Sequence, residues 1–187
     1  LFVGRLVPKK GLAHLLDALP AVIAQRPHAR LTDVGFGPEE SALKAQAGRL
    51  GIADRVAFLG ATPQAELPAH YRRANVFVAP FVRDASGDQE GLPVALMEAL
   101  GCGCPVVVGS VAGVRDLLGS AADAVCVDPR DAGALAAKVV AVLDDPAAAI
   151  ARAHTLRSIA ADRVDWQHIA GGYASLLEAC ISPRGGD

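Results

Sequence analysis

The sequence predicts an α/β fold in which six parallel strands form a sheet that is covered by helices on both faces. Short apolar runs alternate with amphipathic segments along all 187 residues. The composition is 52% hydrophobic and 20% charged, which is enough apolar surface for a sizeable core. Regular alternation of strand and helix is typical of a parallel sheet, because each strand is joined to the next through a helix.

The strands are expected where apolar runs end at glycine, proline or charged residues. These runs cover residues 2–4, 30–35, 55–59, 76–79, 105–108 and 124–127. Apolar residues at helical spacing predict helices from 12 to 19 and over 39–50, 113–118, 132–143, 146–161 and 166–179. Two more helices are expected from Pro63 to Arg73, with Thr62 as N-cap, and from Pro93 to Gly101. Pro38, Pro63 and Pro93 are each placed in the first turn of a helix, and residues 182–187 form a frayed tail.

The overall composition excludes several classes of protein. A formal net charge of −2 and 4% aromatic residues argue against a nucleic-acid surface. The sequence contains no apolar run long enough to span a membrane and no signal peptide. The four cysteines lack metal-binding or C-x-x-C spacing, which favours reduced, mostly buried thiols in the cytoplasm. The chain opens on an apolar run without methionine, so we expect it to be part of a longer protein.

Glycines and charged residues gather where the predicted strands end. Examples are Gly4-Arg5, the G-x-G of Gly35 and Gly37, Gly60 and the loop that carries Glu90. Parallel sheets bind ligands at the carboxyl ends of their strands, next to helix N-termini. We therefore expect a ligand site at this edge of the sheet.

The segment 89–105, Q-E-G-L-P-V-A-L-M-E-A-L-G-C-G-C-P, is the main candidate for this site. Its helix start offers free N–H groups and a positive dipole end, which suit a phosphate. Glu90 and Glu98 would lie about 8–10 Å apart along the helix axis, too far for an acid/base pair acting on one bond. They could instead accept hydrogen bonds from hydroxyls of two different sugars. Helix geometry alone is equally consistent with Glu90 as a charge at the helix N-terminus and Glu98 as a surface acid, neither of which binds a ligand.

Arg5 and Lys10 follow the first strand and could reach a diphosphate, although both could also be solvated surface cations. Gly35 and Gly37 permit close backbone approach of a ligand, and a plain tight turn explains them equally well. Glu40 stands where a dinucleotide fingerprint needs glycine, and no P-loop motif occurs. The five histidines are scattered and are interpreted as structural or solvated.

Four ordered motifs resemble the retaining GT-B glycosyltransferases of group 1 (family 4). E-G-L-P-V-A-L-M-E-A-L-G-C-G-C-P-V-V is similar to their E-x7-E signature, and F-V-G-R-L-V-P-K-K-G-L to the start of their C-terminal domain. V-G-F-G-P-E and V-A-F-L-G resemble two further family segments. The resemblance covers the whole chain and implies one Rossmann-like half of a GT-B fold. It places a nucleotide-sugar-binding domain at 1–164 and, at 165–187, a closing helix and tail that return to a separate N-terminal domain.

The resemblance also implies roles for residues that match the motifs. Arg5 and Lys10 would bind the donor diphosphate and stabilise it as leaving group, and Glu90 would bind the hydroxyls of the donor sugar; these three form the implied catalytic set. Glu98 would hold the ribose hydroxyls. The remaining implied donor-binding residues, including those flanking the nucleotide base, are Gly4, Gly35, Gly37, Phe58, Leu59, Gly91, Leu92, Pro93 and Val94. No cofactor or metal ion is implied, and no Asp-x-Asp signature occurs.

The implied partners are a nucleotide-diphosphate sugar and, through the N-terminal domain, an acceptor sugar or lipid-linked glycan. The protein would be cytoplasmic, with the whole protein able to associate peripherally with the inner face of the membrane. A sugar-nucleotide epimerase, a phosphorylase and a non-enzymatic nucleotide-binding module remain as alternatives. Asp33 departs from the family pattern, which has an aliphatic residue there, and we expect it at a strand end or with polar partners. Phe36 and the segment 114–116 depart as well.

Overall fold

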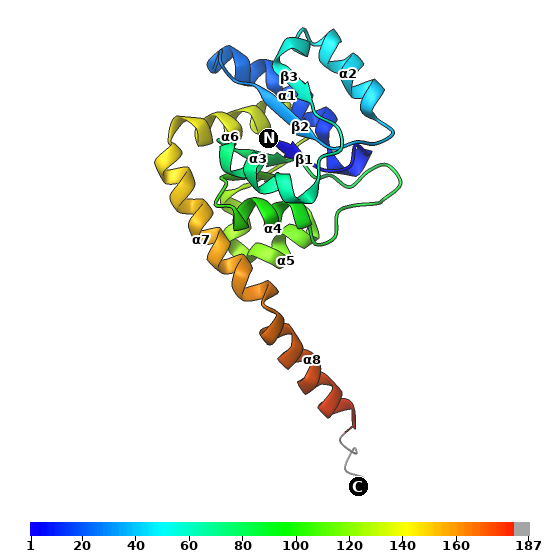
Figure 1. Ribbon diagram of the computed structural model, residues 1–187, viewed down its shortest axis with the longest axis vertical. Coiled ribbons are helices and arrows are strands. Elements are labelled where there is room, and N and C mark those ends of the chain that lie inside the picture. The colour runs from blue at the N-terminus through cyan, green and yellow to red at the C-terminus, as the bar shows by residue number, and fades with distance from the viewer. Residues whose placement is uncertain (182–187) are drawn as a thin grey trace.

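The computed structural model describes residues 1–181 and confirms an α/β fold with parallel strands and helices on both faces (Figure 1). The expected tail at 182–187 lies outside the described residues. All six expected strands are present, each within two residues of its predicted ends. They are β1 (Phe2–Val3), β2 (Leu31–Val34), β3 (Val56–Phe58), β4 (Phe77–Ala79), β5 (Val106–Gly109) and β6 (Cys126–Val127).

The strands form two three-stranded sheets rather than the single six-stranded sheet that was predicted. One sheet has the order β1-β2-β3 and the other β4-β5-β6, and all pairs are parallel. Their edges meet at β1 and β4. The Leu1 ammonium donates a hydrogen bond to the Val76 carbonyl, and the Val78 N–H donates to the Leu1 carbonyl. The two sheets therefore adjoin edge to edge, so the six strands follow the spatial order 3-2-1-4-5-6, and the strand order reverses between β1 and β4.

Seven of the eight α-helices within the described residues form a layer on each face. α1 (Leu12–Gln25), α2 (Glu40–Arg49) and α6 (Ala132–Asp144) pack on one face. The other face is covered by α3 (Leu67–Arg73), α4 (Val94–Gly101), α5 (Ala112–Leu118) and α7 (Pro146–Val164). Short 3₁₀ turns lie at η1 (Pro8–Lys10), η2 (Ala53–Arg55), η3 (Gln64–Glu66) and η4 (Gly119–Ala124).

The protein has two hydrophobic cores, one on each face of the strands, and successive strand residues point into opposite cores. Val78 and Val107 face the layer of α1, whereas Phe77, Val106 and Val108 face the layer of α4. This alternation follows from the pleat of a strand, which points successive side chains to opposite faces. A strand that is buried on both sides therefore has to be apolar at nearly every position, as these runs are.

Three helix starts differ from the prediction, because the prolines precede the helices. Pro63 is extended, Gln64–Glu66 forms a 3₁₀ turn, and α3 begins only at Leu67, so Thr62 is not its N-cap. Pro93 is extended and is itself the N-cap of α4. α2 begins at Glu40, two residues beyond Pro38.

α7 lies against the body of the protein, and α8 (Trp166–Ile181) continues beyond it as a projecting rod (Figure 1). The break between them is at Asp165. No helix among the described residues is long and apolar enough to cross a bilayer. The four cysteines are free thiols, but only Cys104 is buried, whereas Cys102 and Cys126 are half-buried and Cys180 is exposed. The expectation that the thiols are mostly buried is therefore wrong.

The surroundings of Asp33 contradict the prediction that it lies at a strand end or has polar partners. Its side chain is fully buried within β2, beside Phe2 of β1 and Phe58 of β3 in the strand register. Neither carboxyl oxygen has a hydrogen-bond partner among the described residues. Burial raises the pKa of this carboxyl to about 7, and the nearby Glu40 adds to the effect.

Candidate functional site

Lys10 is delivered to the carboxyl edge of the sheet by the 3₁₀ turn that follows β1. This turn ends at Gly11, whose φ of 75° is left-handed and which is also the N-cap of α1. A Cβ on Gly11 would lie 1.9 Å from the carbonyl oxygen of Pro80, directly after β4. Only glycine allows the segments after β1 and β4 to approach so closely, which brings Lys10 toward the loop that carries Glu90.

Lys10 and Glu90 meet at this edge. The Nζ atom of Lys10 lies 2.6 Å from Oε2 of Glu90, and both side chains are mostly buried, at 17% and 16% exposure. The contact is an ion pair without hydrogen-bond geometry, since Oε2 has no hydrogen-bond donor among the described residues. The ammonium also lies 5.3 Å from the centre of the Phe81 ring, a cation–π contact. The structure thus joins two residues that the sequence separates by 80 positions.

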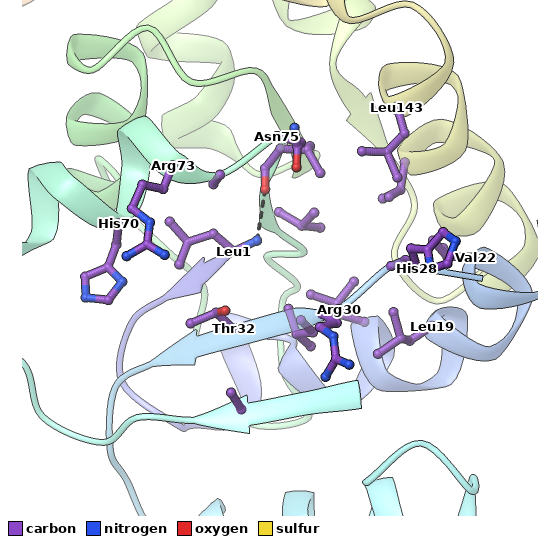
Figure 2. Close-up of a pocket in the computed structure, with 18 of the residues that line it drawn as sticks. Leu1, Leu19, Val22, His28, Arg30, Thr32, His70, Arg73, Asn75 and Leu143 are labelled. Atoms are coloured by element: carbon purple, nitrogen blue, oxygen red, sulfur yellow. Dashed lines mark hydrogen bonds between the residues drawn. The ribbon is translucent and has the colours of Figure 1, made fainter. Parts of the chain in front are cut away.

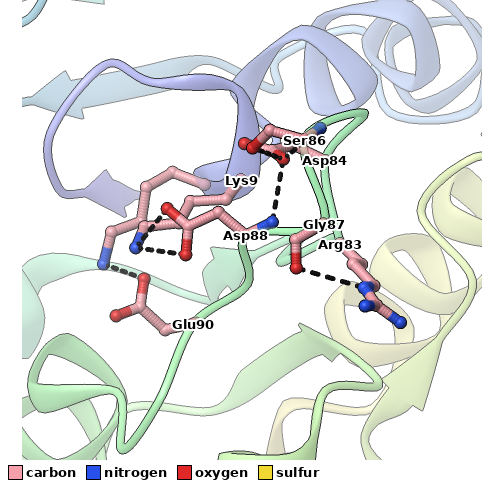
Figure 3. A network of polar contacts seen from close by, with 8 residues as sticks. Lys9, Arg83, Asp84, Ser86, Gly87, Asp88 and Glu90 are labelled. Atoms are coloured by element: carbon pink, nitrogen blue, oxygen red, sulfur yellow. Dashed lines mark hydrogen bonds and ion pairs between the residues drawn. The ribbon is translucent and has the colours of Figure 1, made fainter.

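The loop before Glu90 is held by a polar network (Figure 3). Lys9 forms an ion pair with Asp88, with 3.0 Å between Nζ and Oδ2. The hydrogen bond to Asp88 raises the pKa of Lys9. The Asp84 carboxylate accepts hydrogen bonds from Ser86 and from the Asp88 N–H, and the Ser86 hydroxyl bond lowers the pKa of Asp84. Two neighbouring lysines of one turn therefore form ion pairs with two acids of one loop, Lys9 with Asp88 and Lys10 with Glu90.

The start of α4 is open to solvent and has no side-chain cap. Leu92 and Val94 are about half exposed, at 50% and 59%. Gly91 is exposed, and a Cβ there would meet nothing within 4 Å. Pro93 is buried and carries no N–H, so the free donors come from residues on either side of it. Uncapped N–H groups at the positive end of a helix suit an anion.

Glu98 lies in the second turn of α4, where two side chains hold its carboxylate. Tyr71 donates a hydrogen bond to Oε2 over 2.9 Å, and Gln64 donates to Oε1 over 2.5 Å. The Tyr71 ring is 1% exposed and packs edge-to-face on Phe77. Burial, together with the bond to Glu98, holds the pKa of the Tyr71 phenol above its usual value.

Arg5 lies at the same edge of the sheet as Lys10, although the structure does not join the two. Its side chain is exposed and makes no hydrogen bond or ion pair within residues 1–181. Gly4 is the last residue tied to β2, because its N–H donates to the Val34 carbonyl. The exposed cation is therefore free to turn toward a ligand above β1.

Gly35 and Gly37 are explained by packing of the backbone against itself. A Cβ on Gly35 would lie 1.8 Å from the Gly4 carbonyl oxygen, and one on Gly37 would lie 2.4 Å from that of Leu6. The segment 35–37 lies beside the segment after β1, with the Leu6 N–H donating to the Phe36 carbonyl, and turn residues begin only at Pro38. The close approach therefore involves the protein's own chain, and a tight turn at these glycines is not present. Contact of these glycines with a base stays a prediction.

Phe58 and Leu59, expected beside the base, lie apart from the Lys10–Glu90 pair. Phe58 is half-buried at the end of β3, under the Lys44 ammonium. Leu59 is 48% exposed and lines a cavity of about 450 Å³ (Figure 2). Leu1, Arg30 and Asn75 place most of that cavity at the amino ends of β1, β2 and β4, away from the predicted ligand edge.

Sequence reasoning missed the residues that support the site. They are Lys9, Gln64, Tyr71, Phe81 and Asp88. A buried tyrosine requires a partner for its hydroxyl, so Tyr71 carried a usable signal, but its partner could not be named before the fold was known. Among residues 1–181, no group of three or more His, Cys, Asp or Glu side chains is placed to hold a metal ion.

The family model described as glycosyl transferases group 1 matches residues 1–162. The chain belongs to this family. A GDP-mannose-dependent alpha-(1-6)-phosphatidylinositol monomannoside mannosyltransferase from Mycolicibacterium smegmatis is 37% identical over 176 residues, covering 94% of this chain and 46% of that relative. A glycogen synthase from Mycobacterium tuberculosis is 33% identical over 179 residues, covering 96% and 42%.

Solved structures of glycosyltransferases share the fold of this group 1 family member. Anabaena HepE, solved in complex with UDP, superposes with a TM-score of 0.78 at 27% identity and covers 95% of this chain and 48% of its own. Staphylococcus aureus TarM, in complex with UDP and other ligands, has a TM-score of 0.81 at 15% identity, covering 94% and 34%. The chain therefore spans about half the length of the curated relatives that it matches.

Proposed function

We propose that this chain is the donor-binding part of a glycosyltransferase that moves a glycosyl group from a nucleotide-diphosphate sugar to an acceptor with retained configuration. The observation that carries the proposal is the meeting of Lys10 and Glu90 beside the uncapped start of α4. They meet where β1 and β4 adjoin, which is where open α/β sheets bind ligands. The GDP-mannose-dependent relative and the UDP complex of HepE support a nucleotide-sugar donor.

Each charged residue has a separate part in this reaction. The bond between the anomeric carbon and the diphosphate oxygen breaks, the acceptor oxygen bonds to the same face of the sugar, and the departing diphosphate takes up the proton that the acceptor hydroxyl loses. Arg5, Lys10 and the start of α4 stabilise the negative charge of the departing diphosphate, without a cofactor or metal ion in that role. Glu90 accepts hydrogen bonds from the donor sugar, and Glu98 from the ribose.

The acceptor, a sugar or a lipid-linked glycan, would bind to an N-terminal domain of the whole protein. α8 supplies a surface for that domain, because its large apolar side chains are exposed. They are Trp166, Tyr173, Leu176, Leu177 and Ile181. We assign the whole protein to the cytoplasm, with a peripheral place at the membrane when the acceptor is lipid-linked. Residues 1–187 alone would bind the donor without turnover. Robust transferase activity of this chain would refute the proposal that the donor and acceptor sites lie in separate domains.

Thermal unfolding with candidate donors tests the proposal. UDP, GDP and ADP, with UDP-glucose, GDP-mannose and ADP-glucose, are added to the chain in separate melts. Because a ligand that binds only the folded state stabilises it, one nucleotide series should raise Tm by about 2–5 °C. Arg5→Ala and Lys10→Ala should remove most of this rise.

Arg49→Ala is the control, because Arg49 is an exposed arginine at the end of α2 and far from the β1 edge in sequence. It should keep the full rise in Tm. If no nucleotide stabilises the chain, or if Lys10→Ala responds like the parent, the proposed donor site is wrong.

A further inference from the structure

The carboxylate of Glu98 is fixed by a donor that is itself buried. The Tyr71 hydroxyl lies 2.9 Å from Oε2, and the tyrosine is 1% exposed on α3. Its ring is clamped against Phe77, with 5.5 Å between ring centres and an interplanar angle of 71°. Gln64, the second donor, is exposed on the η3 turn and can exchange with water. Tyr71 is therefore the rigid partner of the pair.

This bond leaves acceptor capacity on Glu98. A carboxylate has about four lone-pair positions, and the two protein donors occupy two of them. Glu98 is only partly buried, so the remaining positions can accept hydrogen bonds from outside the protein. A free glutamate samples several rotamers, and ordering it on binding would oppose binding. A hydrogen bond from a fixed phenol removes that freedom before a ligand arrives.

We infer that Tyr71 is a positioning residue for donor recognition: it orients Glu98 so that the free lone pairs of the carboxylate face the ribose hydroxyls of the bound nucleotide. The inference rests on the proposed role of Glu98. Tyr71 does not touch the nucleotide. Its effect on affinity is exerted through Glu98 and depends on the presence of the ribose hydroxyls.

The test measures how strongly the chain prefers a ribose over a sugar without hydroxyls. Calorimetric titration gives Kd for UDP, GDP and ADP and for their 2′,3′-dideoxy counterparts, with the parent chain and with Tyr71→Phe. The phenylalanine keeps the ring that packs on Phe77 and removes only the hydroxyl. It should reduce the affinity for the preferred ribonucleotide about three- to tenfold, the loss typical of a hydrogen bond to a charged group. The affinity for the dideoxy form should stay within about twofold.

Tyr173→Phe is the matched control. Tyr173 is the other tyrosine of the chain, lies on α8 and is 65% exposed, so its hydroxyl should not affect either affinity. If Tyr71→Phe weakens both forms equally, Tyr71 has only a structural role and the inference is overturned. An unchanged ribose preference in Tyr71→Phe overturns it as well.

Glu98→Gln separates this inference from the function on which it rests. If the parent shows no ribose preference, or if Glu98→Gln keeps it in full, the proposed role of Glu98 is wrong and the inference falls with it. If Glu98→Gln loses the preference while Tyr71→Phe keeps it, only the inference fails. Should Tyr71→Phe not fold, 3-fluorotyrosine can replace both tyrosines, since it retains the ring and makes the hydroxyl a stronger donor. A ribose preference at or above that of the parent then supports the inference, and a fall contradicts it.

Discussion

The ammonium of Lys10 lies 2.6 Å from the carboxylate of Glu90, so the residue proposed to bind the diphosphate is paired with a residue proposed to bind the donor sugar. Both side chains are mostly buried, and an ion pair shielded from water is screened less than one on the surface. In the proposed site, a diphosphate that approaches Lys10 would compete with Glu90. The same competition would free the carboxylate for the sugar hydroxyls and so link the two halves of the proposed donor recognition.

Glu90→Gln should have opposite effects on two ligands. Removing the competing charge leaves Lys10 available, so a nucleoside diphosphate without sugar should bind about two- to fivefold more tightly. The extra affinity for the corresponding nucleotide sugar should be lost, because glutamine is a weaker acceptor. Calorimetric titration with both ligands checks this. Glu40→Gln breaks an ion pair of the same 2.6 Å length, to Lys44 on α2, and should change neither affinity. Weaker binding of the plain diphosphate to Glu90→Gln would contradict the competition.

The Lys9–Asp88 pair should control the mobility of the loop before Glu90. Lys9→Met and Asp88→Asn each remove one partner, and trypsin should then cut after the exposed Arg83 about two- to fivefold faster under native conditions. The exchange Lys9→Asp with Asp88→Lys should restore most of the protection. Asp123→Asn, which breaks the more exposed pair with Arg115, serves as control. Equal cutting of all variants would show that the pair does not restrain the loop.

Two glycines should respond differently to alanine. A Cβ on Gly91 would meet nothing within 4 Å, so the free energy of unfolding of Gly91→Ala should lie within about 0.5 kcal/mol of that of the parent. It should nevertheless weaken nucleotide-sugar binding, because the methyl group occupies space at the exposed helix start. Gly35→Ala would place its Cβ 1.8 Å from a backbone oxygen and should be strongly destabilising. Urea unfolding and calorimetry measure both quantities. Full donor affinity in Gly91→Ala would argue against close approach of a ligand there.

Asp33 should make stability depend on pH. Its pKa is raised from 3.8 to about 7, so the folded state keeps a proton that the unfolded chain has already released between these values. Stability then falls as pH rises from about 4 to about 7 and levels off above that. Asp33→Val removes this loss, and its advantage over the parent in urea unfolding should be larger at pH 8 than at pH 5, by up to a few kcal/mol. Asp54→Asn, on an exposed aspartate, should show no such difference. A pH-independent advantage would mean that Asp33 does not titrate in this window.

The strands and helices were predictable because they depend on local sequence. Apolar runs such as 106–108 must be strands buried on both sides, and the leucines from Leu12 to Leu19 define one helix face. The helix starts were less accurate, because proline suits both the first turn of a helix and the extended residue before it. Asp33 was wrongly expected to lie at a strand end or to have polar partners, since a strand position alone does not reveal what surrounds it.

By itself the sequence determined the α/β class, the edge of the sheet where a ligand would lie, and the candidate residues Arg5, Lys10, Glu90 and Glu98. These follow from periodicity, from glycines at strand ends and from family motifs, all of which are read along the chain. Only the tertiary structure decided that Lys10 pairs with Glu90 and that Tyr71 holds Glu98. Such contacts join segments 80 and 27 residues apart, and they depend on close approaches, like that of Gly11 to Pro80, that no local pattern encodes.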